Sequence, residues 1–399
     1  MLLKSGSRPS ALLQFDDKTS CAPCSKRVAR ARLARGFAGL GWIAMACAPQ
    51  SAFADGVTSA LYVRVDSDDT LVVSPRVHGS THLGEATQFD ATYAADVWTS
   101  ASIDIRASAS RAVTEQRNEL DAAVSHDFGD LVLNGSYRYS IENDYESHGA
   151  NLGGTLELAD NASTLALTAF GFQDQVGRAG DRSFSRALAT LGGRASFTQL
   201  FDSRMFGQLS YEVGSLRGYQ ASPYRFVGIG PGATGFGCTG AVQCFREHVP
   251  DDRLRHALAV LLRRALSTEF SVGVQYRLYF DDWQQVSHTV AADLGWLVGG
   301  NSLLTLSYRF YTQSGVYFYS KIYTTPADLA AYITRDREQS PMQGQRVGID
   351  LENRSPLAEG GPKFVFNLRL GGVMYSYSAF VGLTRVYALE ATLALGLEN

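Results

Sequence analysis

The feature that most constrains this 399-residue chain is a period of two in its hydrophobic pattern. Between Phe270 and Phe280 every second residue is apolar, aromatic or both, whereas Ser271, Gln275 and Arg277 occupy positions in between. Successive side chains of a β-strand point to opposite faces, so this segment has one apolar and one polar face. The same alternation recurs in three further segments, 131–141, 304–310 and 387–397. The pattern predicts strands that separate an apolar environment from water.

Composition favours a membrane protein built from such strands. Charged residues make up 19% of the chain, whereas soluble domains usually carry about 25%. The chain contains 19 Tyr, 21 Phe and 39 Gly. It has no uninterrupted apolar run of the roughly 18 residues that a transmembrane helix needs. This combination is typical of a membrane barrel whose strands alternate between lipid-facing and water-facing residues.

Turn-forming residues divide the chain into candidate strands of about ten residues or more, a length that suits tilted membrane strands. These are 69–80, 86–97, 99–108, 118–127, 130–141, 145–158, 161–174, 185–198, 201–215, 254–266, 268–281, 283–297, 302–315, 342–353, 362–374 and 385–397. We interpret 58–66 as an N-terminal extension or as part of the first strand. A count of fourteen strands is also compatible with the pattern.

The lengths of the connections support a barrel. Outer-membrane barrels have short periplasmic turns and longer external loops. The connections on one predicted side are short at 98, 128–129, 159–160, 199–200, 267 and 298–301, and moderate at 354–361. Both long connections, 216–253 and 316–341, fall on the other side. We therefore predict an all-β fold: a transmembrane, antiparallel, up-and-down β-barrel of about 16 strands.

The N-terminus carries the three parts of a signal peptide in order. A basic segment from Lys26 to Arg35 precedes an apolar segment from Gly36 to Ala48, and Ala-Phe-Ala then precedes Asp55. This order is typical of export followed by cleavage. The predicted organisation is a signal peptide with a long lead-in at 1–54 and an outer-membrane β-barrel at 55–399.

Export and the alternating pattern together predict an outer-membrane location. The expected partners are outer-membrane lipid and lipopolysaccharide, the barrel-assembly machinery during biogenesis, and small solutes. Removal of 1–54 would take away eight basic and two acidic residues, which lowers the formal net charge from −3 to −9. Such an acidic chain argues against a nucleic-acid partner.

Two cysteines remain after the predicted cleavage, Cys238 and Cys244, and they enclose a short glycine-containing loop. In an oxidising compartment this spacing predicts a disulfide. A metal site would need more ligands than these two thiols and His248 supply. The acidic cluster 66–70 could bind Ca²⁺, although carboxylates in a turn are more often only solvated. No metal and no cofactor are therefore predicted.

One arrangement of residues recurs along the chain. The segments 137–148 and 276–288 each hold a Tyr-Arg pair, further aromatics, acidic residues and a final Ser-His, and 308–314 is a partial copy. Arg138, Arg277 and Arg309 are thereby predicted to point inward near the external mouth. They line the pore, where rings of charge set selectivity, or they pair with nearby carboxylates and brace the wall. The candidate pore-lining residues are Arg138, Arg277, Arg309, Glu142 and Asp281.

The two Ser-His dipeptides, Ser147-His148 and Ser287-His288, raise the alternative of a serine hydrolase. Adjacent residues of a strand face opposite sides, so neither serine could be activated by its neighbouring histidine. Ser147 and Ser287 should face the lumen, and His148 and His288 should face the lipid headgroups. No enzyme activity is predicted.

Several segments resemble one bacterial family. These are 62–75 with its acidic centre, YRYSIENDY at 137–145, GYQASPYRFV at 218–227, 276–283 before Ser287-His288-Thr289, and YRFYTQS at 308–314. They are similar, in order, to the family catalogued as domain of unknown function 3570, over most of 60–353. The resemblance implies an outer-membrane barrel and implies no particular activity. The insertion Gly228–Cys244 and the C-terminus depart from the family pattern.

Two functions fit a barrel of this size. The first is a porin-like passive pore for small solutes, because sixteen strands leave room for an aqueous channel. Loop 216–253 could then fold inward as a constriction. The second is a non-conducting structural or surface-interaction barrel, in which the disulfide holds the same loop outward as a binding element.

Overall fold

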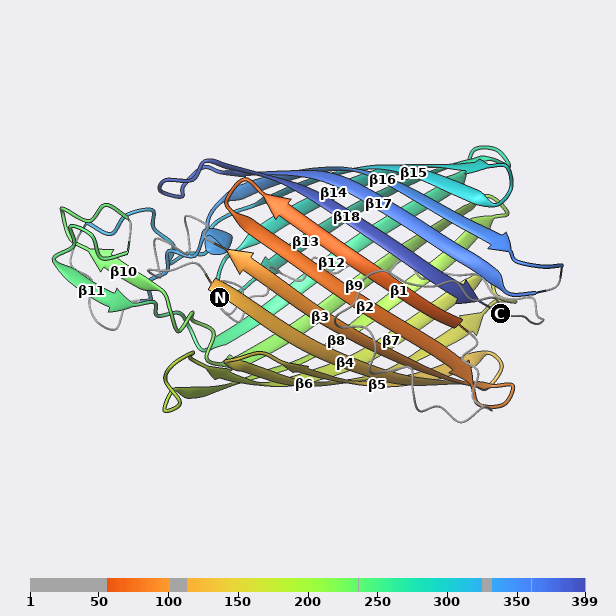
Figure 1. Ribbon diagram of the computed structural model, residues 1–399, viewed down its shortest axis with the longest axis horizontal. Helices are drawn as coiled ribbons and strands as arrows, with labels where there is room; N and C mark the ends of the chain where they lie inside the picture. The colour runs from red at the N-terminus through yellow and green to blue at the C-terminus, as the bar shows by residue number, and fades with distance from the viewer. Residues whose placement is uncertain (1–55, 101–112, 236, 325–331, 360, 399) are drawn as a thin grey trace, which may run out of the picture.

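The computed structural model describes residues 56–100, 113–235, 237–324, 332–359 and 361–398, and sixteen strands within them form one closed barrel (Figure 1). The barrel strands are β1 Gly56–Asp66, β2 Thr70–His82, β3 Thr87–Ser100, β4 Val113–Asp127, β5 Leu131–Ile141, β6 Tyr145–Leu158, β7 Ser163–Gly177, β8 Ser185–Asp202, β9 Met205–Gly218, β12 Asp252–Ala265, β13 Phe270–Asp281, β14 Val286–Val298, β15 Ser302–Gln313, β16 Met342–Pro356, β17 Lys363–Tyr377 and β18 Arg385–Glu398. No helix among the described residues is long and apolar enough to cross a membrane.

Neighbouring strands of the barrel are antiparallel throughout. β1 pairs with β18, which closes the sheet and brings Gly56 opposite Glu398. We call this end of the barrel the terminal end and the opposite end the loop end. The long connections 219–251 and 314–341 both lie at the loop end. Long loops on one side and short turns on the other confirm the predicted up-and-down topology.

Strand β13 shows how the pattern of the sequence is used. Phe270, Val274 and Phe280 point outward and are 38%, 50% and 40% exposed. Arg277 and Tyr279 point to the lumen. Outward-facing positions of the other described strands also carry exposed apolar side chains, for example Leu152, Leu191 and Leu389. The barrel therefore has an apolar outer surface and a polar lumen, as the alternation predicts.

Two predictions near the N-terminus were wrong, and they offset each other in the strand count. The segment predicted to be an extension is a full barrel strand, β1, which pairs with both β2 and β18. The turn predicted at 98 is absent, because β3 continues to Ser100. The connection 83–86 consequently lies at the terminal end, not at the loop end. The remainder of the predicted strand 99–108 and the predicted signal peptide 1–54 fall outside the described residues.

Turns at the terminal end contain residues in the left-handed backbone region. Ala159, Asp160 and Asn161 have φ values of 53°, 52° and 67°, and Gly299 and Gly300 have φ values of 61° and 79°. Successive positive φ values match the right-handed twist of the strands that a tight hairpin joins. Glycine and asparagine adopt this region at low cost, which explains why these short connections stay short.

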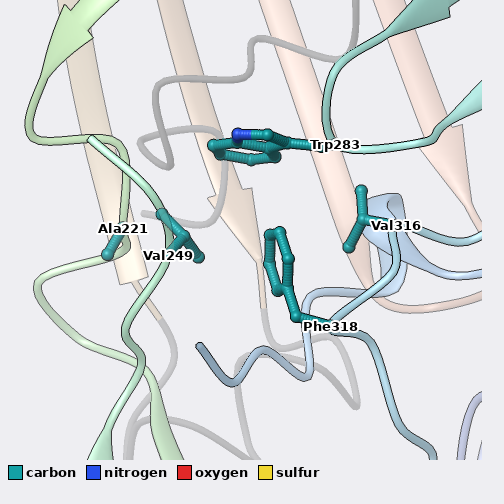
Figure 2. Close-up of a cluster of buried hydrophobic side chains, with 5 residues drawn as sticks. All are labelled: Ala221, Val249, Trp283, Val316 and Phe318. Atoms are coloured by element: carbon teal, nitrogen blue, oxygen red, sulfur yellow. The ribbon is translucent and has the colours of Figure 1, made fainter. Parts of the chain in front are cut away.

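The long loops pack together into a cap at the loop end. Ala221 and Val249 come from connection 219–251, Val316 and Phe318 come from connection 314–341, and Trp283 comes from the turn after β13 (Figure 2). Trp283 is only 3% exposed and its ring packs edge-on against Phe318. Trp283 therefore faces the loops and not the lipid. Its indole fixes the loops to one another.

Candidate functional site

The middle of the lumen is lined with charged side chains that solvent reaches. Glu390 accepts hydrogen bonds from Arg64 and Arg346, each at 3.1 Å. Arg194 pairs with Glu212 at 2.6 Å on the wall opposite in strand order. The side chains of Arg64, Arg346 and Arg194 are 21%, 29% and 36% exposed. These arginines are held in place by carboxylates and are still hydrated.

Arg277 and Arg309 differ from these arginines. Within the part of the chain that the structure describes, neither forms a hydrogen bond or an ion pair. Both are half-buried on the lumen face. Arg277 lies opposite Thr289 on β14, and Arg309 lies opposite Arg346 on β16. The two guanidinium groups are close enough to interact electrostatically with one another. Their positive charge is therefore not neutralised by direct contact with a carboxylate.

Two hydroxyl side chains complete this region of the wall. Thr289 lies between Arg277 and Tyr311 in one row of the sheet. Its hydroxyl oxygen is buried and has no hydrogen-bond partner among the described residues. We call Arg277, Thr289, Arg309 and Tyr311 the arginine patch. Arg277 and Arg309 offer charged donors to an anion in the lumen, whereas the hydroxyl of Tyr311 already donates to Gln313.

Arg138, the third arginine of the recurring arrangement, faces the lumen on β5. Its guanidinium lies over the ring of Phe172 at 4.9 Å and is 4.0 Å from Glu119. It also lies opposite Asp121 in the register of β4 and β5. Arg138 therefore contacts a carboxylate, as expected of an arginine that braces the wall. Within the described chain, Arg277 and Arg309 face the lumen without such a contact, as expected of residues that line the pore. Glu142 lies in the turn after β5, where its N–H donates to a backbone carbonyl.

Asp281 occupies a buried position at the end of β13 and not an open lumen wall. It accepts a hydrogen bond from the Arg253 side chain and one from Tyr279 at 2.7 Å. The indole of Trp283 covers the same guanidinium at 4.1 Å. Sequence reasoning missed Arg253, because the partner it considered for the Asp281 carboxylate was Arg277, the arginine on the same strand. The register between β12 and β13 places Arg255 opposite Asp281, and the side chain of Arg253, two residues nearer the loop end, reaches the carboxylate diagonally.

Many inward-facing residues nearest the loop end are buried. They are Ser140, Ser147, Asp174, Leu188, Leu216, Tyr279 and Ser287. The loops therefore cover much of the wall at this end, whereas the middle of the lumen stays hydrated. This covering narrows the barrel on the side of the long loops.

A buried charge network holds the two long loops together. Arg225 donates to Glu247 at 3.0 Å and contacts Asp336 at 3.0 Å, and all three side chains are 1–2% exposed. Burial raises the pKa of Glu247, and Asp336 raises it further, whereas Arg225 opposes the rise. Thr334 donates to Glu247 and Ser222 donates its N–H at 2.7 Å. Buried charges need such partners, and here the partners come from both loops.

Part of connection 314–341 enters the mouth of the barrel. The inward side chain of Gln313 donates to the carbonyls of Glu338 and Ser340, both at 2.7 Å. Arg337 donates to Asp68 at 2.7 Å, in the turn between β1 and β2. We call Asp336–Ser340, which contains the short helix η2 (Arg337–Gln339), the inner segment. It bridges β15 and the β1–β2 turn, which are four strands apart in the barrel order.

The disulfide-closed hairpin lies elsewhere. Strands β10 (Phe226–Ile229) and β11 (Gln243–Arg246) pair with each other and extend away from the barrel beyond its rim (Figure 1). Cys238 and Cys244 form the predicted disulfide, with their Cα atoms 5.4 Å apart. The element that folds inward is therefore the inner segment, and not the tip of the loop 216–253 that the sequence suggested as a constriction.

The acidic cluster between β1 and β2 is used by the backbone and by the inner segment. Asp66 accepts hydrogen bonds from the N–H groups of Asp68 and Thr70, both at 3.0 Å. Asp68 binds Arg337. Within the described ranges no group of three or more His, Cys, Asp or Glu side chains is arranged to hold a metal ion.

A closed antiparallel barrel with an apolar outer surface and a charged, hydrated lumen defines the class of outer-membrane-type β-barrels. Residues 72–190 and 186–360 match the family described as Protein of unknown function (DUF3570), so the chain belongs to this family. This match confirms the resemblance of the motifs. Among curated proteins, none matches this chain.

Several solved structures have a similar arrangement of strands. A bacterial polysaccharide outer membrane secretin shares 9% identity and a TM-score of 0.49, over 86% of this chain and 98% of that chain. OccD1 (OprD) shares 8% identity and a TM-score of 0.42, over 86% of this chain and 94% of that chain. The siderophore receptor PirA from Pseudomonas aeruginosa shares 10% identity and a TM-score of 0.39, over 85% of this chain and 79% of that chain. Similarity of this degree carries no conclusion about what this chain transports or binds.

Proposed function

We propose that this protein is a passive outer-membrane pore for small water-soluble solutes and that it favours anions bearing a carboxylate or phosphate group. The arginine patch carries the proposal, because it places Arg277 and Arg309 in the lumen without a carboxylate partner among the described residues. Guanidinium groups bind carboxylates and phosphates through paired hydrogen bonds. The unsatisfied hydroxyl of Thr289 adds a neutral donor beside them.

The barrel itself supports passage of solutes. Barrels of sixteen strands are wide enough to leave an aqueous channel, whereas eight strands enclose only side chains. The inner segment would narrow the channel at the loop end. The arginine patch, which lies nearer the terminal end than the inner segment, would select solutes by charge. No energy source is needed for such a pore, since charge and diameter alone decide what passes.

Replacing both patch arginines, in the double variant Arg277→Gln and Arg309→Gln, is expected to lower the chloride-to-potassium permeability ratio. Two unit charges about 8 Å away in water together stabilise an anion by ~1 kcal/mol and destabilise a cation by the same amount. Salt screening roughly halves both effects, so the ratio should fall about fivefold. The ratio is measured from the reversal potential across a planar bilayer in a KCl gradient.

The matched control is Arg264→Gln, which removes the same charge from the outer face of β12 near the terminal end. Its permeability ratio should equal that of the unmodified protein. An unchanged ratio in the double variant would show that the patch does not select anions.

Delivery to the outer membrane would require removal of the predicted signal peptide at 1–54 and insertion by the barrel-assembly machinery. The order of basic segment, apolar segment and Ala-Phe-Ala supports this proposal. Protein purified from outer membranes is expected to begin at Asp55, as determined by N-terminal sequencing. A mature protein that retains the basic segment would contradict the proposed cleavage.

A second candidate function is a non-conducting barrel that binds a partner through its loops. It is favoured by the buried inward-facing side chains at the loop end and by the hairpin β10–β11, which projects beyond the rim. In that case a folded and inserted protein would carry no ionic current, and the disulfide-closed hairpin would be the binding element.

A further inference from the structure

The recurring arrangement in the sequence has a counterpart on the outer face of the barrel. The hydroxyl of Tyr276 forms a hydrogen bond with Nδ1 of His288 at 2.8 Å. Tyr211 and His256 form the same bond at 2.7 Å. The tyrosine of each pair is 42% exposed. Both pairs lie on outward-facing positions of their strands, toward the loop end.

The two pairs have the same geometry. His288 lies opposite Leu278 in the register of β13 and β14, and Tyr276 stands two residues before Leu278 on the same face. His256 lies opposite Val213, and Tyr211 stands two residues before Val213. Repetition of a diagonal cross-strand pair on separate hairpins indicates a shared role on this surface.

The hydrogen bond to Nδ1 determines what each ring offers to its surroundings. We assign to both pairs the tautomer in which the tyrosine hydroxyl donates to Nδ1, which leaves the imidazole proton on Nε2 and makes this nitrogen a donor. Among the described residues, Nε2 of His256 and of His288 has no partner. Each pair thus presents one oriented N–H group on the outer surface.

The two donors belong to one continuous stretch of wall. Strands β9, β12, β13 and β14 are successive neighbours in the barrel. His256 stacks on Phe280 of β13 at 4.9 Å, and His288 pairs with the same strand two residues further from the loop end. Two strand spacings and two residues of rise place the histidines roughly 12 Å apart. Arg217, 80% exposed on the outward face of β9 nearer the rim, lies 3.6 Å from Asp252, so this pair adds no net charge to the surface.

We propose that this strip, made of Tyr211, His256, Tyr276 and His288, binds the phosphate groups of a phosphorylated glycolipid in the outer leaflet. The proposal rests on the outer-membrane location given under Proposed function, and not on conduction. The strip lies at the margin of the apolar outer surface nearest the loop end, where lipid headgroups would contact the protein. Two N–H donors spaced about the length of a disaccharide fit a headgroup that carries two phosphates.

A third tyrosine–histidine pair provides an internal control. Tyr137 and His148 form the same bond at 2.6 Å between β5 and β6. Here, however, a carboxylate oxygen of Glu146 lies 3.3 Å from Nε2. The carboxylate occupies the donor and repels a phosphate, so this pair is not part of the binding strip.

The experiment measures binding of fluorescent lipopolysaccharide to the folded protein in a zwitterionic detergent by fluorescence anisotropy. The double variant His256→Phe and His288→Phe keeps both rings and removes both donors. Hydrogen bonds to a charged group are worth enough that its affinity should fall about tenfold or more. His148→Phe, the matched control, should bind like the unmodified protein.

A second arm uses the unmodified protein alone and so does not depend on how the variants fold. Lipopolysaccharide from which the phosphates have been removed should bind as weakly as intact lipopolysaccharide binds the double variant. Inorganic phosphate at millimolar concentration should not displace the lipid, which distinguishes a headgroup site from a free-phosphate site.

Equal binding of phosphorylated and dephosphorylated lipid, or equal loss in the control and double variants, would overturn the proposal. Displacement by inorganic phosphate would also overturn it. Because binding is measured without current, a barrel that fails to conduct would leave this test intact.

Discussion

Replacing Arg225 with methionine is expected to detach the two long loops from each other while the barrel stays folded. Arg225 contacts both Glu247 and Asp336, and all three side chains are buried. Its loss leaves two buried carboxylates facing each other, at a cost of about 3–5 kcal/mol. Limited proteolysis should therefore cut 219–251 and 314–341 much faster.

The barrel should survive this change, because its strands are joined by their own backbone ladders. Heat-modifiable mobility on gels reports the barrel separately from the loops. Arg217→Met is the matched control: Arg217 and Asp252 are 80% and 79% exposed and 3.6 Å apart. An exposed pair of this kind contributes little to stability. Equal protease resistance of the Arg225 variant and the unmodified protein would show that the network does not hold the cap.

Replacing Arg337 with alanine is expected to release the inner segment from the β1–β2 turn and widen the mouth. The side chains of Arg337 and Asp68 are 16% and 3% exposed and 2.7 Å apart, and the guanidinium lies 5.9 Å from the centre of the Tyr377 ring. A charged hydrogen bond contributes about 1.5–3 kcal/mol. The detached state should thus become at least about tenfold more populated.

This change should appear in single-channel records as larger or more frequently fluctuating current steps. Lys321→Ala removes a positive charge from an exposed position of the same loop and should leave the records unchanged. Identical currents in the Arg337 variant and the unmodified protein would mean that the inner segment does not limit the pore.

The alternation of residues predicted most of the barrel strands, because successive side chains of a strand face lipid and lumen in turn and therefore alternate between apolar and polar. Strand β5, predicted at 130–141, spans Leu131–Ile141, and β6 was predicted with its exact bounds. The turn at 98 was wrong, because β3 continues through that stretch to Ser100. Strand β1 was then excluded to preserve the order of short and long connections.

The sequence also predicted correctly that the candidate arginines face the lumen, but it did not predict which carboxylates they contact. Period two places Arg138, Arg277 and Arg309 on the lumen side. Which carboxylate each one meets depends on cross-strand register, and sequence alone does not give that register. Asp281 was a candidate beside Arg277, yet it pairs with Arg253 of the neighbouring strand.

The cap could not be predicted, because its contacts join residues far apart in the chain. Arg225 and Asp336 belong to different loops, and the inner segment reaches Asp68 near the start of the barrel. Loop sequences carry no periodic signal, so the suggestion that loop 216–253 folds inward as a constriction rested on its length and on its glycine-rich, disulfide-closed tip. The disulfide instead closes the hairpin that points away from the barrel.

The most direct test of the pore is single-channel recording of the refolded protein in a planar bilayer. We expect stable, stepwise conductance with a reversal potential that favours anions. A protein that folds and inserts but carries no current would contradict it, and would direct attention to the loops as a binding surface.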